Sequence, residues 1–210
     1  MIKLSRCEVQ ADPAGVFTQG PLYDSSSDAR LVEEVRRGNK DAFGVLVGRY
    51  EKKVQRVVLR LVHDREQARD LAQETFLKVY QHLDKFDTSR RIGPWLFRVA
   101  VNLAVDWLRR QKSTVRLRHG GGGEEDNFEI PDPDPRPQIE LGQEVQWVLE
   151  QIPLNYRTVL ILRDLEGFSC SEVAAIEGRR EATIRWRLSR AREMFRQIWD
   201  RRQQSGRRLG

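Results

Sequence analysis

The chain has 210 residues, of which 39% are hydrophobic and 32% are charged, and its formal net charge is +6. This length allows one or two domains, and the excess of basic side chains indicates an anionic partner. No apolar run approaches the roughly 20 residues that a membrane-spanning helix needs, and the N-terminus lacks the apolar segment of a signal peptide. These features exclude a membrane-inserted protein, and we expect a cytoplasmic one.

Cysteine and histidine are too sparse for a metal site or a disulfide framework. Cys7 and Cys170 stand far apart, and the three histidines are scattered along the chain. No nucleophile stands at a recognisable spacing from a histidine. The four consecutive glycines at 120–123 lack the Lys-Ser/Thr pair of a phosphate-binding loop. We therefore expect no metal, no cofactor and no enzymatic activity.

The chain begins with an extension that is followed by a helical domain. Residues 1–27 have no helical or strand periodicity, and we expect them to be disordered. Over residues 28–112, apolar side chains recur at steps of three and four, which is typical of amphipathic helices. Asp28 is predicted to cap the first helix of this domain, and Gly38 to end it.

Two later helices of this domain are marked by signals at their starts. Asp64 and Gln67 have the spacing of a capping-box variant, which predicts that a helix begins after Asp64. Pro94 suits the first position of the next helix, because that position needs no backbone donor. Residues 84–93, which precede it, are predicted to form a loop.

The composition changes sharply over residues 113–137. This segment holds four consecutive glycines, four prolines and six acidic residues. Such a composition cannot build a packed core, so it predicts a flexible linker. Helical periodicity resumes at Ile139, and residues 138–210 form the second predicted domain. Because no strand pattern of useful length is found, we predict an all-α fold with two small helical domains joined by a flexible linker.

The second domain contains the pattern of a helix-turn-helix. Ser169 and Glu172 have capping-box spacing at the start of a short helix, and Gly178 permits a tight turn at its end. In the next helix, apolar residues recur at steps of four and three from Ile184 to Ile198. Two helices joined by a short glycine turn predict a helix-turn-helix, which is a common DNA-binding motif.

Arginine is concentrated on the second helix of this motif. At about 100° per residue from Ile184, the side opposite the apolar stripe carries Ala182, Arg185, Trp186, Ser189 and Arg190. Arginine binds guanine edges and phosphates, so a helix in the major groove of DNA needs this arrangement. A solvated basic face is the alternative interpretation, but solvent gives no reason to expose an indole such as that of Trp186.

Four segments of the chain resemble bacterial sigma factors. Ile152–Arg157 and Val159–Ser169 resemble the opening of region 4, Asp70–Tyr80 resembles region 2.2, and Trp95–Asn102 resembles the start of region 2.4. The segments stand in the family's order, and only a linker separates the two regions. The chain is therefore similar to the two-domain, extracytoplasmic-function group of the sigma-70 family.

This resemblance implies an initiation factor that binds core RNA polymerase and directs promoter-specific transcription. It implies recognition of the −10 and −35 promoter elements, melting of the −10 element, and contacts with the β′ clamp helices and the β flap of the polymerase. Many relatives are also held by an anti-sigma factor. The polymerase-binding residues that the resemblance implies are Asp70, Leu71, Gln73, Glu74 and Phe76.

The resemblance also implies two sets of DNA-binding residues. The loop at 84–93 is implied to capture a base flipped out of the −10 element. The set for this element is Lys85, Phe86, Asp87, Arg90, Arg91, Arg98, Asn102 and Arg109. The set for the −35 element is Arg179, Thr183, Arg185, Trp186, Arg187, Ser189 and Arg190. Trp95 is interpreted as a core residue, with base stacking as the alternative, and Arg187 is expected to anchor phosphates.

Two other classes of protein compete with this interpretation. A helix-turn-helix regulator that binds operator DNA as a dimer explains the second domain, but leaves the motifs of the first domain without a role. An enzyme with a DNA-binding appendage would need converging carboxylates, whereas the compact acidic set of this chain lies in the predicted linker.

Overall fold

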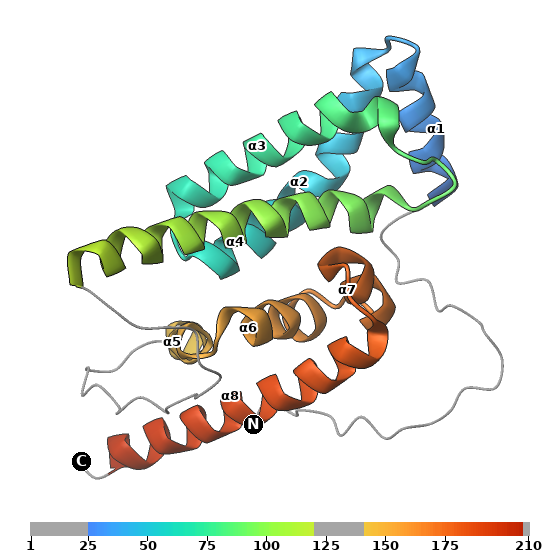
Figure 1. Ribbon diagram of the computed structural model, residues 1–210. Helices are drawn as coiled ribbons and strands as arrows, with labels where there is room; N and C mark the ends of the chain where they lie inside the picture. The colour runs from blue at the N-terminus through green and yellow to red at the C-terminus, as the bar shows by residue number, and fades with distance from the viewer. Residues whose placement is uncertain (1–24, 120–140, 208–210) are drawn as a thin grey trace, which may run out of the picture.

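The computed structural model describes residues 25–119 and 141–207, and every regular element in these two ranges is helical. Helices α1 to α4 gather in one half of the molecule and α5 to α8 in the other (Figure 1). The predicted all-α fold is confirmed. The predicted disordered extension is wrong at residues 25–27, which are helical. Its remaining part, residues 1–24, and the predicted linker from residue 120 onward lie outside the described residues.

The N-terminal half is built around its second helix. Its elements are α1 (Ser25–Arg36), α2 (Lys40–Val62), α3 (Arg65–His82), the 3₁₀ turn η1 (Leu83–Lys85) and α4 (Ile92–His119). Helix α2 packs against α1, α3 and α4. Its apolar stripe is almost wholly buried, and it comprises Leu46, Tyr50, Val54, Val57, Val58 and Leu61. Because each such side chain contributes about 1.5–3 kcal/mol when it is buried, this stripe contributes strongly to the stability of the half.

The boundaries of α2 and α3 follow from capping side chains. Asn39 caps α2 by accepting hydrogen bonds from two backbone N–H groups of its first turn. Asp64 caps α3 by accepting from the backbone N–H of Gln67, as its spacing predicts. Between these helices His63 takes left-handed backbone with φ of 62°, a conformation that side chains other than glycine rarely adopt.

The predicted cap of the first helix is wrong. Helix α1 begins at Ser25, so Asp28 lies within its first turn rather than before it. The Asp28 side chain is instead buried, where it pairs with Arg49 at 2.5 Å and accepts a hydrogen bond from the Tyr50 hydroxyl. A buried carboxylate needs such partners, because an unpaired charge in the core is strongly unfavourable. Asp28 therefore joins α1 to α2.

Helix α4 is longer at both ends than the sequence predicts. It begins at Ile92, two residues before Pro94, and a proline in the first turn removes no helical hydrogen bond. It continues to His119, so residues 113–119 of the predicted linker are helical. These seven residues contain no glycine or proline, and the helix ends where the four glycines begin.

The C-terminal half contains the predicted helix-turn-helix. Its elements are α5 (Leu141–Gln151), α6 (Leu154–Leu160), the π-helical turn η2 (Ile161–Leu165), α7 (Cys170–Glu177) and α8 (Glu181–Arg207). Helix α8 packs against α5, α6 and α7. The predicted apolar stripe of α8 is confirmed at Ile184, Leu188, Ala191 and Ile198, which are all buried.

The turn of this motif has the predicted chemistry. The Ser169 hydroxyl accepts from the backbone N–H of Glu172 at 3.1 Å, and the Glu172 carboxylate accepts from the backbone N–H of Ser169 at 2.9 Å. This is the reciprocal capping box. Gly178 follows α7 in left-handed backbone with φ of 63°, as a glycine at a helix end does. The capping box and the turn fix the direction in which α8 leaves α7.

The two halves are in contact through an aromatic side chain. Phe168, between η2 and α7, is buried, and its ring centroid lies 4.8 Å from that of Phe97 on α4. The Lys53 ammonium of α2 lies 3.9 Å from the centroid of the Phe168 ring, which is a cation–π contact. Burial lowers the pKa of Lys53, while the charge of Glu166 opposes that shift. Phe168 thus lies against two helices of the other half.

A buried carboxylate also joins the halves. The Glu166 side chain is fully buried, and its two oxygens lie 3.0 and 3.1 Å from Nε of Arg56. Nη1 of Arg60 lies 2.6 Å from Oε1 of Glu166. Both arginines belong to α2, so one carboxylate of the C-terminal half holds two cations of the N-terminal half. Helix α4 also packs against α7 across the same boundary. Within this contact, we call the cluster around α2 the domain interface: Glu166, Arg56, Arg60, Phe168, Phe97 and Lys53.

Candidate nucleic-acid interface

An acidic and amide face lies on α3. Asp70, Gln73 and Glu74 are exposed, and their spacing of three and four residues places them on one side of the helix. Leu77 continues this side and is 58% exposed, which is unusual for a leucine. Glu74 pairs with Lys78 at 3.0 Å, one turn further along. The face therefore combines carboxylates, an amide and one apolar side chain.

Two residues of the expected polymerase-binding set do not belong to this exposed face. Leu71 and Phe76 are only 5% and 7% exposed, because they form the stripe by which α3 packs into the core. The expectation that their side chains are offered to a partner is corrected by this burial. They hold α3 in place beneath the polar residues instead.

The segment between α3 and α4 is a short, ordered loop. Phe86 is buried, with its ring centroid 4.9 Å from that of Trp95 on α4. Trp95 is partly buried and packs against the core, as its interpretation as a core residue predicts. Lys85, Asp87 and Arg90, in contrast, are exposed. The loop thus keeps its aromatic side chain inside and its charged side chains outside.

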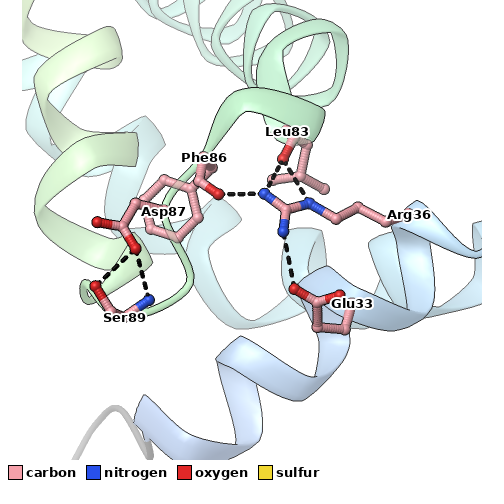
Figure 2. A network of polar contacts seen from close by, with 6 residues as sticks. All are labelled: Glu33, Arg36, Leu83, Phe86, Asp87 and Ser89. Carbon is pink, nitrogen blue, oxygen red and sulfur yellow. Dashed lines mark hydrogen bonds and ion pairs between the residues drawn. The ribbon is translucent and has the colours of Figure 1, made fainter.

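Asp87 closes a turn within this loop. Its Oδ1 accepts from the backbone N–H of Ser89 at 3.0 Å and from the Ser89 hydroxyl at 2.6 Å (Figure 2). Its other oxygen lies 3.3 Å from Nε of Arg90. The two bonds from Ser89, followed by the charge of Arg90, hold the pKa of Asp87 below its ordinary value.

This shift predicts how the turn responds to acid. A carboxylate whose pKa is lowered by folding stabilises the folded turn above its unfolded pKa, and this contribution disappears as pH falls through the lower folded value. We therefore expect the Ser89 bonds to persist to a lower pH than an aspartate with an ordinary pKa of about 3.9 would allow. The Asp87 carboxyl resonance, followed by NMR during acid titration, measures this. A midpoint at or above the ordinary aspartate value contradicts the prediction.

The arginines expected to contact the −10 element lie on or beside α4. Arg98, Asn102 and Arg109 are exposed, and their spacing keeps them near one side of the helix. Arg91, just before α4, pairs with Glu172 of α7 at 3.1 Å. Arg98 lies beside the helix-turn-helix turn, since a Cβ added to Gly178 would come within 2.9 Å of its guanidinium. Part of this expected DNA face therefore contacts the other half.

The outer face of α8 carries the residues expected to read the −35 element. Arg185, Trp186, Ser189 and Arg190 are all exposed, and Trp186 is 61% exposed. Arg185 pairs with Glu181 at 2.7 Å and Arg190 with Glu193 at 2.8 Å along the same helix. Arg179 is exposed and Thr183 is half-buried at the start of the helix. The outward face predicted from helix geometry is thus present.

Arg187 does not belong to this face. Its side chain is 16% exposed and pairs at 2.9 Å with Glu177 of α7. Burial raises the pKa of Glu177, and Arg187 opposes that rise. The expectation that Arg187 anchors phosphates is therefore corrected: it joins the two helices of the motif. Its position three residues after the buried Ile184 places it on the flank of the apolar stripe.

The described part of the chain offers neither a metal centre nor a membrane span. In residues 25–119 and 141–207, no group of three or more His, Cys, Asp or Glu side chains is placed to hold a metal ion. None of the helices in these ranges is long and apolar enough to cross a bilayer. The exposed charged faces of α3, α4 and α8 are the main candidates for function.

Comparison with known proteins places both halves in one family. Residues 46–114 match the family model "Sigma-70 region 2", and residues 143–195 match "Sigma-70, region 4". The chain is 36% identical to the RNA polymerase sigma-H factor of Pseudomonas aeruginosa, over 82% of this chain and 93% of the relative. It is 30% identical to the sigma factor SigW of Bacillus subtilis, over 80% of this chain and 94% of the relative.

A solved structure supports the same assignment. The sigma factor RpoE of Bartonella quintana, solved in complex with the anti-sigma factor NepR, matches with a TM-score of 0.60 and 25% identity. The match covers 75% of this chain and 96% of the solved one. With both family regions present in order and relatives matched over most of their length, the chain belongs to the extracytoplasmic-function group of the sigma-70 family of RNA polymerase sigma factors.

Proposed function

We propose that this sigma factor divides promoter recognition between two faces: the outer face of α8 reads the −35 element, and the loop before α4, together with that helix, reads the −10 element. The observation that carries this proposal is the exposure of Arg185, Trp186, Ser189 and Arg190 opposite the buried stripe of α8. Arginines meet guanine edges in the major groove, and the indole offers an apolar contact to a thymine methyl group.

The −10 side of the proposal rests on the composition and exposure of the loop. Lys85 and Arg90 supply positive charge for a single DNA strand, and the exposed Asn102 offers both a donor and an acceptor to a base edge. The proposed unit for this element covers residues 28–112, and the unit for the −35 element covers residues 138–210. The polymerase supplies the chemistry of RNA synthesis, and the chain supplies only specificity.

The proposed docking face for the polymerase is the exposed side of α3. Asp70, Gln73, Glu74 and Leu77 combine charge with an apolar centre, which suits a basic partner helix. The β′ clamp helices are the proposed partner, and the C-terminal half is proposed to bind the β flap. An anti-sigma factor is a further proposed partner, since the related RpoE of Bartonella quintana is solved with one.

Charge reversal on α3 tests the docking face. We expect Asp70→Lys with Glu74→Lys to weaken binding to core polymerase by roughly tenfold, because it places like charges against a basic partner. Both residues lie outside the core, so the free energy of unfolding should change by less than about 0.5 kcal/mol. Affinity is measured by fluorescence anisotropy with labelled chain, and stability by urea denaturation.

A matched control separates docking from general electrostatics. Asp41→Lys with Glu51→Lys reverses two exposed acids of α2 in the same half, so it changes the net charge equally, and it should leave the affinity for core polymerase unchanged. Equal losses from both changes would indicate a non-specific effect of net charge. If the α3 variant binds core polymerase as well as the unmodified chain does, another face carries the docking.

The competing class, a helix-turn-helix regulator without a polymerase, is not favoured. It requires only the C-terminal half, whereas the family match extends through residues 46–114. The two classes differ in two simple measurements. A sigma factor comigrates with core RNA polymerase in size-exclusion chromatography and enables run-off transcription, while an operator-binding dimer does neither.

A further inference from the structure

One arginine of α1 donates hydrogen bonds from its side chain to the backbone of the loop before α4. Arg36 is the last residue of α1, and its Nε lies 3.2 Å from the carbonyl oxygen of Leu83. Its Nη2 lies 3.0 Å from that same oxygen and also donates to the carbonyl oxygen of Phe86. Figure 2 shows the guanidinium between these two carbonyls. One side chain therefore holds two points of a loop about 50 residues away.

The carbonyls that Arg36 binds lie where the regular hydrogen bonding of α3 has ended. The Leu83 oxygen accepts a backbone bond of 3.3 Å from the N–H of Phe86, which closes η1. Because a carbonyl oxygen has two lone pairs, both carbonyls can accept the guanidinium as a further donor. Leu83 is 2% exposed, so water has little access to that residue. A charged donor at such a helix end is stabilising, because it complements the partial negative charge of the carbonyls. Arginine suits this position because its planar group presents several donors in a fixed geometry.

The guanidinium is itself held in place. Nη1 of Arg36 lies 2.8 Å from Oε1 of Glu33, one turn earlier on α1 (Figure 2). The Arg36 side chain is only 25% exposed. Since one edge of the guanidinium faces Glu33 and the other faces the loop, Arg36 is unable to rotate away without losing several bonds. The position of the loop is thereby tied to the end of α1.

The grip on Leu83 and Phe86 complements the other restraints of the loop. The Phe86 ring packs on Trp95, and the Asp87 carboxylate binds Ser89. The backbone N–H of Arg90 donates to the carbonyl of Asp87 at 3.0 Å. The loop is therefore restrained at both ends. The side chains of Lys85, between Leu83 and Phe86, and of Arg90, just after Ser89, remain exposed.

We propose that Arg36 is a positioning residue for −10 recognition: it fixes the loop from Leu83 to Ser89 in the shape that receives an unstacked base. This inference rests on the proposed role of the loop in reading the −10 element. A loop already held in its binding shape loses less conformational entropy when DNA binds, so it gains both affinity and selectivity. Arg36 need not touch DNA to have this effect.

The test compares four variants in holoenzymes reconstituted with core polymerase. Arg36→Ala removes all three hydrogen bonds to the loop. Arg36→Lys keeps a cation at the site but loses the planar group with its several donors. It provides a second test if Arg36→Ala fails to fold. Glu33→Gln removes only the charge that orients the guanidinium. Arg30→Ala is the matched control, because Arg30 also lies on α1 and pairs with Glu34 at 3.0 Å, without an observed bond to the loop.

The probe is a pool of fork-junction DNA whose single-stranded nontemplate segment is randomised across the −10 region. Bound molecules are recovered and sequenced, which gives the base preference at each position. We expect Arg36→Ala to lower the preference at one base position on the order of tenfold, with an intermediate loss for Arg36→Lys and a smaller one for Glu33→Gln. The other positions, and the affinity for core polymerase, should stay unchanged, as should every preference of Arg30→Ala.

Amide hydrogen exchange supplies a second readout. The amides of Ser89 and Arg90 should exchange faster in Arg36→Ala, while those of α3 and α4 keep their protection. A holoenzyme that selects no base in the single-stranded segment would refute the proposed role of the loop itself. If the unmodified chain selects bases and Arg36→Ala selects them equally well, the positioning role of Arg36 is overturned. A uniform loss of preference at every position would overturn it as well.

Discussion

Replacing Glu166 by glutamine is expected to separate the two halves of the molecule. The carboxylate is fully buried and accepts from both Arg56 and Arg60. Glutamine keeps the shape but turns an N–H donor toward two guanidinium groups that have donors only. Breaking a buried ion pair costs about 3–5 kcal/mol, and since the two arginines keep partial access to water we expect about 2–4 kcal/mol here. The loss falls on the contact between the halves.

Calorimetry and small-angle scattering measure this outcome. We expect the variant to unfold in two transitions where the unmodified chain unfolds in one, and its radius of gyration to be larger, because most helix packing lies within each half. The matched control is Asp164→Asn, which removes the same charge two residues earlier. Asp164 pairs with Arg192 at 2.6 Å inside the C-terminal half, so its loss should leave the radius of gyration unchanged. A compact Glu166→Gln variant with a single transition would refute the expectation.

Removal of either outer arginine of α8 is expected to weaken binding to the −35 element by about 1–3 kcal/mol. Arg185 and Arg190 lie beside Trp186 on the exposed face of α8, which is the face proposed to contact base edges. Each arginine also neutralises a glutamate of its own helix, so its loss leaves Glu181 or Glu193 facing the phosphates. The lost base contact and the uncovered glutamate both weaken binding to DNA. Selectivity at the contacted base should fall together with affinity.

The measurement is selection by holoenzyme from duplex DNA that is randomised across the −35 region. Arg185→Ala and Arg190→Ala should each lose preference at different base pairs. Arg69→Ala, which removes an exposed arginine of α3 and changes net charge equally, should keep every preference. Identical preference profiles for all three variants would mean that α8 contacts only the DNA backbone.

Local signals in the sequence predict the helix-turn-helix well. The reciprocal bonds of Ser169 and Glu172 and the left-handed backbone of Gly178 follow directly from residue types at fixed spacing. The outward position of Arg185 and Trp186 follows from the periodicity of α8. The same periodicity also places Arg187 beside the buried Ile184, so its pairing with Glu177 was open to prediction from the sequence.

Contacts between distant residues leave no comparable local pattern. Glu166 looks in sequence like an ordinary surface acid before a glycine, and its two partners lie 110 and 106 residues earlier. Arg36 likewise looks like an exposed cation at a helix end, and only the folded chain brings Leu83 to it. The buried pairing of Asp28 with Arg49 and Tyr50 was missed for the same reason.

The domain interface has a consequence for the order in which the molecule is completed during synthesis. Arg60 leaves the ribosome 106 residues before its partner Glu166. At about 5–20 residues per second, this gap lasts roughly 5–20 s. Helices α1 to α4 pack mainly on one another, so we expect the N-terminal half to fold in that interval, with Lys53, Arg56 and Arg60 still uncovered. We therefore expect each newly made molecule to pass through a stage in which this basic surface is open to nearby anions, before its own C-terminal half covers it.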